Sequence, residues 1–429
     1  MNPLFPDRSA LIRDPLGFLA HKTSSADTAS TPLRLGFHRV HLVRDLALIQ
    51  DAPFRPGTLC VSTSPSAMLL PMATDEASHK HGNTPTKAKI EPGESLEIIE
   101  ALADDLLADL RRAAFSALRH ASFDAWRFST ILATKFTFTA LFGVRSALII
   151  DEELFAHHAQ FVSVSRDLNS INIICNQKRQ IRDRERSCKQ SLQFIESAIQ
   201  TAFTHMQSRS ICGYAYSATH PSSPSEEIFQ LAHAIQQATA EAFFWGIFML
   251  SHDKTVSSAI EKEADACASP NGDINKNKLR LAHTAKDASL EILRLSPLHN
   301  MIIFLGQTDT NLSRLKFLPN DKILISPHVI FRSERYLQKA SSVIIGRQYP
   351  RDLPALYHLS CGGGIVFQIV LLNLMLLLID LTAAFELELV EGPPEFKVTP
   401  SFLGARPDLK LRLNYRRSRL FRYAETLQP

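Results

Sequence analysis

The sequence predicts a mainly α-helical single domain with small β-sheets, an α+β fold. Two observations support this prediction. Apolar residues recur at helical spacing through most of residues 97–295, and short runs that alternate apolar and polar residues occur near both ends of the chain. A chain of 429 residues can bury a large core without disulfide or metal staples. No internal repeat divides it, so we expect one large domain over residues 1–429.

The composition is that of an ordinary globular protein. Hydrophobic residues make up 45% and charged residues 21% of the chain, which excludes wholesale disorder and collagen-like repetition. The net charge of +4 is too small to indicate a nucleic-acid-binding protein. Six scattered cysteines form no CxxC motif and no zinc-type spacing, which favours a reducing compartment. Because the first residues contain no apolar run of signal-peptide or anchor length, we expect a cytoplasmic protein, either free or peripheral at a membrane.

Residues 1–70 are expected to hold a lead helix and a β-hairpin. The helix begins within residues 14–20, with Pro15 in its first turn, a position that proline favours. Residues 33–43 alternate apolar and polar, which predicts a hairpin or two short strands. Residues 71–95 have no periodicity and predict a mobile loop.

The region 97–295 is expected to form the helical core. Gly143 predicts the C-cap of one of its helices. Residues 176–190 mix charges of both signs, which is typical of a solvated helix face, with a basic docking patch as the alternative. The helices themselves are expected at residues 97–119, 124–142, 227–250, 254–268 and 281–295.

The region 296–429 changes character and predicts strands around a very apolar segment. That segment, residues 364–385, is long enough to cross a membrane. Gln368, Asn373 and Asp380 interrupt it and no basic flank follows it, so a buried core helix is favoured over a membrane span. The strands are expected at residues 300–305, 322–326, 386–390 and 410–415.

Four segments of the second half carry chemically active residue types in a fixed order. Each has an ordinary structural explanation by itself: a helix-surface ion pair, a threonine bonded back to a carbonyl, or a cysteine packed as a small apolar residue. The segments are residues 236–239 (QQAT), Glu291 with Arg294, residues 326–336 followed by Arg347, and residues 360–364 (SCGGG).

Taken together, these segments resemble the haem-thiolate monooxygenases, the cytochrome P450 family. EILRLSP matches the family's ExxR helix, and LISPHVIFRSERY resembles the stretch usually written PxxxHRDPxxY. The resemblance runs from the N-terminal helix and hairpin to the C-terminal strands. The spacing from Thr239 to Trp245, and residues 385–394 (FELELVEGPP), are most similar to the sterol 7-alpha-hydroxylase and prostacyclin synthase branch.

The resemblance implies a cytochrome P450-like single large domain that binds haem b. It implies a monooxygenase that oxidises a small apolar substrate, sterol-, lipid- or terpenoid-like, with dioxygen and external electrons. The expected partner is an electron-donating reductase or ferredoxin, with no nucleic acid, and the expected state is a monomer. Residues 296–429 would then hold the haem loop as well as the C-terminal strands.

The resemblance also assigns roles to individual residues. A thiolate bound to haem iron favours O–O cleavage, and backbone donors around its sulfur need a close approach that glycine permits. The implied residues are Cys361 as the axial thiolate and iron ligand, Gly362 and Gly363 beside it, His358 near a haem propionate, Thr239 as a proton relay, and Glu291, Arg294 and Arg347 as a structural ion-pair cluster.

Several positions depart from the family pattern. The haem loop carries Pro354, Tyr357 and Leu359 where the family has Phe, Gly and a basic residue. Ala238 replaces the acid before the distal threonine, and Phe331 replaces the histidine of the HRDP stretch. Two alternatives within the family therefore stay open: a degenerate, non-catalytic member, and a peroxide isomerase or dehydratase, which needs no proton relay to dioxygen.

Two hypotheses from other classes also remain. A non-enzymatic carrier of apolar ligands would use the same helical pocket without needing Cys361, and it would be colourless. An integral membrane protein would use residues 364–385 as its span, and it would require detergent.

Overall fold

The computed structural model describes most of the helical core and the strands at both ends. The loop expected at residues 71–95 and the candidate ligand Cys361 lie outside the described residues. The described residues are 14–24, 30–35, 38–45, 60–61, 97, 101–143, 153–158, 160, 181–215, 226–268, 274–279, 281–305, 310–312, 315–317, 322–350, 353–360, 364–391 and 409–416.

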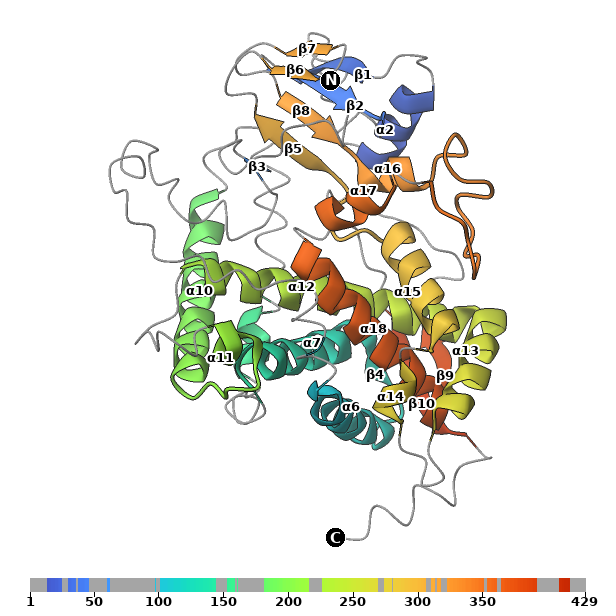
Figure 1. The fold of residues 1–429 in the computed structure, drawn as a ribbon. Helices are drawn as coiled ribbons and strands as arrows, with labels where there is room; N and C mark the ends of the chain where they lie inside the picture. Colours follow the sequence, from blue (N-terminus) through green and yellow to red (C-terminus); the bar gives the residue numbers. More distant parts are fainter. Residues whose placement is uncertain are drawn as a thin grey trace.

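The fold is mainly α-helical with small β-sheets, as the sequence predicts. Figure 1 shows a sheet region at the top and a larger helical body below it. The helices of the body are α6 (Ala103–Leu118), α7 (Ala125–Phe142), α10 (Ile181–Thr204), α11 (Ile211–Ala215), α12 (Glu226–His252), α13 (Lys254–Cys267), α14 (Lys276–Leu279), α15 (His283–Leu295) and α18 (Gly364–Ala384).

The upper sheet brings together strands from distant parts of the chain. Its five strands lie in the order β1-β2-β8-β5-β3, with β2 and β8 parallel and the other neighbours antiparallel. The hairpin expected at residues 33–43 is confirmed, because β1 and β2 pair from Leu35 and His38 outward. The strands are β1 (Ser30–Leu35), β2 (His38–Val43), β3 (Cys60–Val61), β5 (Ile302–Leu305) and β8 (Lys322–Ile325).

A small separate core supports this sheet. The lead helix α2 (Pro15–Ser24) begins with Pro15 in its first turn as expected, and Asp14 Oδ1 accepts a hydrogen bond from Gly17 N at 3.0 Å. Alternation along the strands turns one row of apolar side chains toward this core. Its buried members are Leu19, Leu33, Val40, Leu42, Met301, Leu324 and Val329.

Helix α7 begins and ends where the sequence predicts. Asp124 Oδ1 caps its start by accepting a hydrogen bond from Arg127 N, and Gly143 ends it with a φ of 100°. The backbone N–H of Gly143 donates to Thr139 O at 2.9 Å, which satisfies one of the last carbonyls. Fourteen of its 18 residues are buried, so α7 is an internal helix.

The centre of the molecule is the packing of α12 against α7 and α18. Edge-on ring contacts join Phe243 of α12 to Phe136 of α7 with centroids 5.3 Å apart. Gly246 lets α12 approach α18 closely, because a Cβ there would lie 2.8 Å from Leu374 Cδ1. A buried carboxylate on α18 is paired as well: Asp380 accepts from Arg111 of α6 at 3.0 Å.

Helix α18 is the apolar segment whose environment the sequence left open. Among the described residues it is the one helix long and apolar enough to cross a membrane, and 72% of its most apolar window is buried inside the structure. Helices α12, α13, α15 and α6 surround it in Figure 1. This burial is that of a core helix.

The C-terminal strands form a second sheet in the order β4-β10-β9. Strand β9 (Phe385–Glu391) follows α18 directly and pairs antiparallel with β10 (Lys410–Tyr415), as expected, and β4 (Phe123–Asp124) adds an edge. The structure also holds elements that the sequence analysis did not predict. These include a hairpin of β6 (Thr310–Leu312) and β7 (Leu315–Phe317), the short helices α16 (Pro327–Phe331) and α17 (Leu353–Ser360), and the elements β3, α11 and α14.

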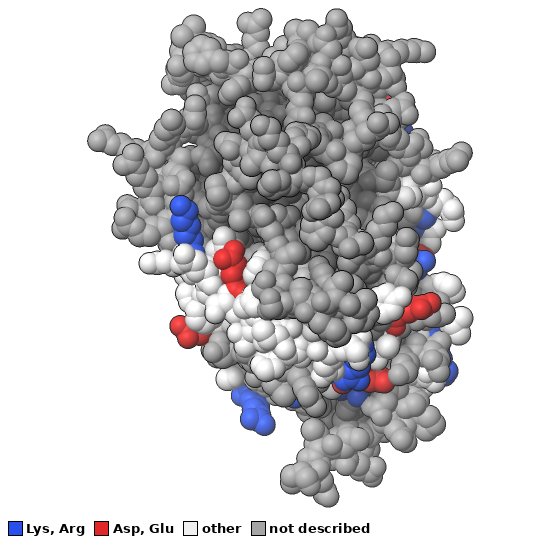
Figure 2. Space-filling model, turned by 60° about the vertical axis from the view of Figure 1, so that its left-hand side comes forward, with Lys and Arg blue, Asp and Glu red and all other residues white. Residues whose placement is uncertain are grey.

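Figure 2 shows one face of the molecule with its charged side chains coloured. On this face, the described acidic and basic residues are interspersed and form no continuous patch of one sign. This distribution agrees with the small net charge of +4.

Candidate functional site

The best-defined polar site is centred on α15. Glu291 and Arg294 lie one turn apart on the same helix face, and both side chains are fully buried. The guanidinium binds the carboxylate through two hydrogen bonds, Nε to Oε1 at 2.7 Å and Nη2 to Oε2 at 2.9 Å. This two-point geometry holds both side chains in fixed orientations.

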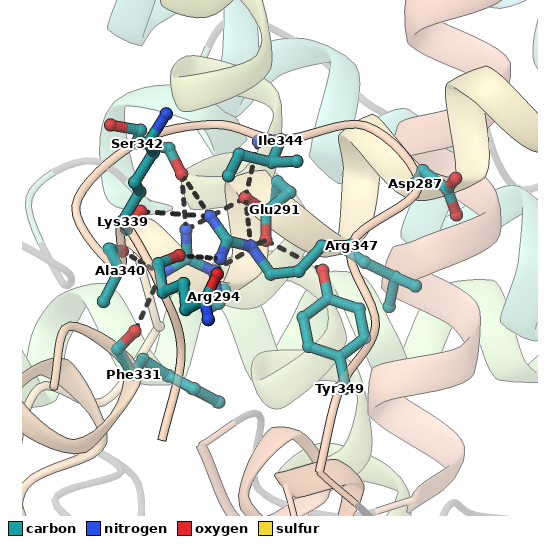
Figure 3. A network of polar contacts seen from close by, with 12 residues as sticks. Asp287, Glu291, Arg294, Phe331, Lys339, Ala340, Ser342, Ile344, Arg347 and Tyr349 are labelled. Atoms are coloured by element: carbon teal, nitrogen blue, oxygen red, sulfur yellow. Dashed lines mark hydrogen bonds and ion pairs between the residues drawn. The ribbon is translucent and has the colours of Figure 1, made fainter. Parts of the chain in front are cut away.

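The other donors of Arg294 bind the chain segment that follows α16. Nη1 donates to the carbonyls of Phe331, at 2.7 Å, and Ala340, and Nη2 donates to Ser342 O at 2.9 Å. With the two bonds to Glu291, all five N–H groups of the guanidinium are therefore used. Figure 3 shows these acceptors converging on Arg294 from one side.

Glu291 binds the same segment a few residues later. Its carboxylate accepts from Arg347 Nε at 3.1 Å, from Ile344 N at 2.9 Å and from the Tyr349 hydroxyl at 2.8 Å (Figure 3). Arg347 in turn donates to three carbonyls of the segment, including Ser342 O at 2.8 Å. The structure thus brings Glu291, Arg294 and Arg347 into one buried network.

The electrostatics of the network fit a structural role. Burial acts to raise the pKa of Glu291, but hydrogen bonds and charge from Arg294, with further hydrogen bonds from Ile344 and Tyr349, hold that pKa below its usual range. Burial and the adjacent Glu291 raise the pKa of Tyr349. The carboxylate stays ionised with its oxygens fully engaged, so the network locks the chain rather than exchanging protons.

The segment held by this network is locked at other points too. The carboxylate of Glu334 accepts from the backbone N–H of Lys339 and Ala340, both at 2.9 Å. Gly346, with a φ of 75°, donates its N–H to Asp287 Oδ2 at 2.9 Å. Ordered backbone without regular secondary structure therefore leads from α16 toward α17.

A second candidate feature lies at the middle of α12. Thr239 is fully buried, and its hydroxyl has no hydrogen-bond partner among the described residues. Other buried threonines, Thr134 and Thr137 of α7, donate to the carbonyl four residues earlier, both at 2.8 Å. The ordinary explanation for a helical threonine, a bond back to the helix, does not apply to Thr239.

Thr239 lies on the face of α12 that packs against α18. It precedes Gly246 by seven residues, close to two full turns, so the two share a helix face. Gly246 is the residue whose missing Cβ admits Leu374 of α18. Gln236, one turn before Thr239, is turned toward α7 and donates to Thr134 Oγ1 at 3.4 Å.

Comparison with known proteins identifies the architecture. No family model matches the chain, and no curated protein does. A solved structure described as a cytochrome P450 (CYP102L1) is similar, with a TM-score of 0.67 and 17% sequence identity over 96% of this chain and 99% of that chain. The chain has the cytochrome P450 fold. The likeness extends to the fold alone and does not single out the sterol or prostanoid branch.

Because the chain has the P450 fold, the residues around Cys361 are the candidate haem site. Cys361, Gly362 and Gly363 lie outside the described residues, but both flanking elements are described. Ser360 before them is fully buried, and its carbonyl accepts from His299 N at 3.2 Å. Helix α18 begins right after them, with no acidic residue in its first turn. A helix N-terminus near a thiolate stabilises its negative charge.

The side chain of Tyr357 is compatible with this site. The residue occupies the position where the family has glycine, and α17 places its ring against Phe331 and Phe367, with centroids 4.8 and 5.4 Å away. Its hydroxyl donates to Leu290 O of α15 at 3.2 Å. The side chain thus packs between α15, α16 and the first turn of α18. The hydroxyl of Thr239, which has no partner among the described residues, lies on α12. The described residues on either side of Cys361 and the unpartnered hydroxyl of Thr239 are compatible with a haem site.

The two described cysteines whose side chains are placed do not fit a thiolate role. Burial raises the pKa of the Cys212 thiol to about 12, and burial together with Glu263 raises the pKa of Cys267. Both thiols stay protonated at neutral pH, whereas a haem ligand must ionise. His358 lies in α17, with its side chain outside the description, so its role stays a prediction.

Sequence reasoning missed Tyr349 as a member of the network, and it identified Tyr357 only as a departure from the family's haem loop, without its contacts. Tyr349 follows Arg347 by two residues and binds the same carboxylate. A tyrosine at that distance from a predicted ion-pair arginine was the available signal. The contacts of Tyr357 reach residues 290, 331 and 367, and no local pattern announces them.

Proposed function

We propose that the chain is a haem-thiolate monooxygenase that oxidises an apolar substrate. The P450 fold supports a haem enzyme of this general kind. The observation that carries the proposal is the place of Cys361 in the sequence, directly after the buried Ser360, whose carbonyl accepts from His299 N, and three residues before α18 begins. Bound haem b would supply the activation of dioxygen, and a thiolate ligand favours that chemistry.

Each group of residues has a defined task in this proposal. Cys361 would bind the iron, and Gly362 and Gly363 would let backbone N–H groups approach its sulfur. His358 would contact a propionate. The network of Glu291, Arg294 and Arg347 would keep the chain before Cys361 in place without touching the reacting atoms.

Thr239 would hold and pass a proton on the substrate side. Its hydroxyl is free to donate because no carbonyl of α12 accepts from it in the description. The fully buried site excludes bulk water, so proton delivery depends on positioned groups. This role distinguishes a monooxygenase from a relative that rearranges peroxides.

The proposed substrate is a sterol-, lipid- or terpenoid-like molecule, and the proposed partner is a reductase or ferredoxin that supplies electrons. The sequence similarity of residues 385–394 and of the Thr239–Trp245 spacing to the sterol and prostanoid branch motivates this substrate class. A monomeric, cytoplasmic protein without nucleic-acid binding is part of the same proposal. Binding of sterols and fatty alcohols would shift the haem absorption band.

One alternative function has an observation in its favour. A P450-like protein that folds without haem would tolerate a bulky residue in the haem loop, and Tyr357 replaces the family's glycine there as part of the helix α17. Such a protein would keep the network around Glu291 and lose the need for Cys361.

A reduced carbon-monoxide difference spectrum tests the proposal. We expect the full chain, produced with ample haem, to show the thiolate-type band, and Cys361→Ser to lose it. Cys188→Ser, in α10, is the matched control and should leave the band unchanged. A wild-type protein that folds, by circular dichroism, but binds no haem would support the alternative and overturn the proposal.

A further inference from the structure

A cavity of about 400 Å³ lies on another side of α12 from Thr239. It forms where the C-terminal ends of α12 and α15 meet the segment after α16. Trp245 is six residues beyond Thr239, which places it about 120° around the helix. We call this cavity the α12–α15 pocket, and it is lined by Trp245, Phe248, Met249, His252, Asp253, Ile292, Leu295, Ser296, Arg332, Ser341 and Val343.

The wall from α12 is aromatic and preformed. Trp245 meets Phe248 edge-on with ring centroids 5.8 Å apart, and Phe248 stacks on His252 at 5.4 Å. Ile292 and Leu295 of α15 supply an aliphatic wall. Pockets for small molecules typically have this composition, mostly apolar with a few polar groups, and volumes of roughly 300–1,000 Å³.

Arg332 is the cation of the pocket, and it lacks a counterion among the described residues. Its Nη1 lies 3.0 Å from His328 Nδ1. Burial, followed by the charge of Arg332, holds the pKa of His328 well below its usual range, so the imidazole is neutral and accepts the hydrogen bond. This contact leaves the positive charge of Arg332 uncompensated.

Neither of two carboxylates in these surroundings forms an ion pair with Arg332 among the described residues, although one of them, Asp253, lines the same pocket. Glu291 is bound by Arg294 and Arg347. Asp253 caps α13, with its Oδ1 accepting from Thr255 N and Val256 N, both at 3.0 Å. Burial and the charge of Arg294 lower the pKa of Arg332 to about 9, the direction expected for a cation without a negative partner.

We propose that the α12–α15 pocket binds a small molecule with an apolar body and one carboxylate, such as a medium-chain fatty acid. The carboxylate would pair with Arg332, whose planar guanidinium suits two-point recognition of such a group. The apolar body would lie against Trp245, Phe248 and Leu295. This site is independent of haem and of the proposed monooxygenase function.

Isothermal titration of the full chain with decanoate, decanol and decyltrimethylammonium tests the site. We expect saturable binding of decanoate at one site, and binding of decanol and the ammonium compound weaker by about tenfold or more. Arg332→Gln should weaken the binding of decanoate by a similar factor and leave the affinity for decanol unchanged. Arg335→Gln is the matched control, because Arg335 is exposed and lies over the ring of Tyr336.

Two further measurements keep the test decisive if Arg332→Gln fails to fold. Val343→Trp should fill the pocket and abolish the binding of decanoate and of decanol. Trp126→Phe leaves Trp245 as the one remaining tryptophan of the chain's two, and brominated decanoate should quench its fluorescence saturably. Equal affinity for decanoate and decanol, unchanged decanoate binding in Arg332→Gln, or calorimetric binding of decanoate that Val343→Trp does not abolish would overturn the proposal.

Discussion

Thr239, like Thr130 of α7, is a buried threonine whose hydroxyl has no hydrogen-bond partner among the described residues. Threonines inside helices usually satisfy their hydroxyl on the preceding turn, as Thr134 and Thr382 do here. A buried hydroxyl left without a partner costs free energy unless something else occupies that place. In the proposed function, a molecule bound on the substrate side of the site would be the missing hydrogen-bond partner of the Thr239 hydroxyl.

The residue-scale prediction for Thr239 concerns coupling. Thr239→Ala should raise oxygen consumption relative to product formation, because positioned proton transfer is typically worth about 10²–10⁴-fold. Thr239→Ser keeps the hydroxyl and should restore coupling. The measurement is the ratio of product formed to oxygen consumed. Normal coupling in Thr239→Ala would favour the peroxide-isomerising alternative.

A second residue-scale prediction concerns Glu291. Glu291→Ala leaves two buried guanidinium groups without their carboxylate, and breaking a buried pair in this way costs about 3–5 kcal/mol. We expect the yield of soluble, haem-loaded protein to fall sharply. Exposed Glu386→Ala is the control, since its contact with Lys254 is on the surface. A Glu291→Ala protein with wild-type unfolding free energy and haem content would show that the network is dispensable.

At the scale of elements, the accuracy of sequence-based prediction follows the range of the interactions. Helix α7 is predicted to within a residue because Asp124 and Gly143 cap it locally. Helix α17 is missed because it depends on Tyr357, whose ring and hydroxyl bind residues far along the chain. The Glu291–Arg294 pair follows from helical spacing, whereas the carbonyls of Ala340 and Ser342 that Arg294 binds have no sequence signature.

Gly143, at a helix end, and Gly346, in a loop, allow the cost of backbone strain to be compared with the cost of crowding. Gly143 has a φ of 100°, and a Cβ there would lie 2.8 Å from Gln207 Cβ. Gly346 has a φ of 75° with open space around it. Gly346→Ala should therefore cost about 1 kcal/mol of backbone strain, and Gly143→Ala about 1–3 kcal/mol more from crowding. Urea unfolding of both variants measures the difference, and equal destabilisation would contradict the crowding at Gly143.

At the scale of the whole molecule, burial of histidines makes stability depend on pH. Burial lowers the pKa of His233 and of His299 to about 4, against 6.5 for an exposed histidine. Between these values the unfolded chain binds more protons than the folded one, so acid favours unfolding. Each of these histidines should remove about 1.4 kcal/mol of stability per pH unit from pH 6.5 down to 4.

Unfolding free energies measured in urea at pH 7 and pH 5 test this dependence. We expect a clear loss of stability at pH 5, and a shallower loss in His299→Leu, which removes one titrating group. His252→Leu is the control, because the His252 ring stacks on Phe248 at the surface of α12. A pH dependence unchanged in His299→Leu would contradict the contribution of that residue.

The network around Glu291 also determines how the molecule opens. The backbone amides of Lys339 and Ala340, Ile344 and Gly346 donate to carboxylates of Glu334, Glu291 and Asp287, not to carbonyls of a helix or strand. Their hydrogens can exchange with solvent when those side chains swing away, while α15 stays wound. In native-state hydrogen exchange, residues 339–346 should therefore open together as one unit, at a lower free energy than α15 itself. The exchange rates of these amides would report whether the network around Glu291 is intact. The measurement needs no bound cofactor, no absorption band and no enzymatic activity.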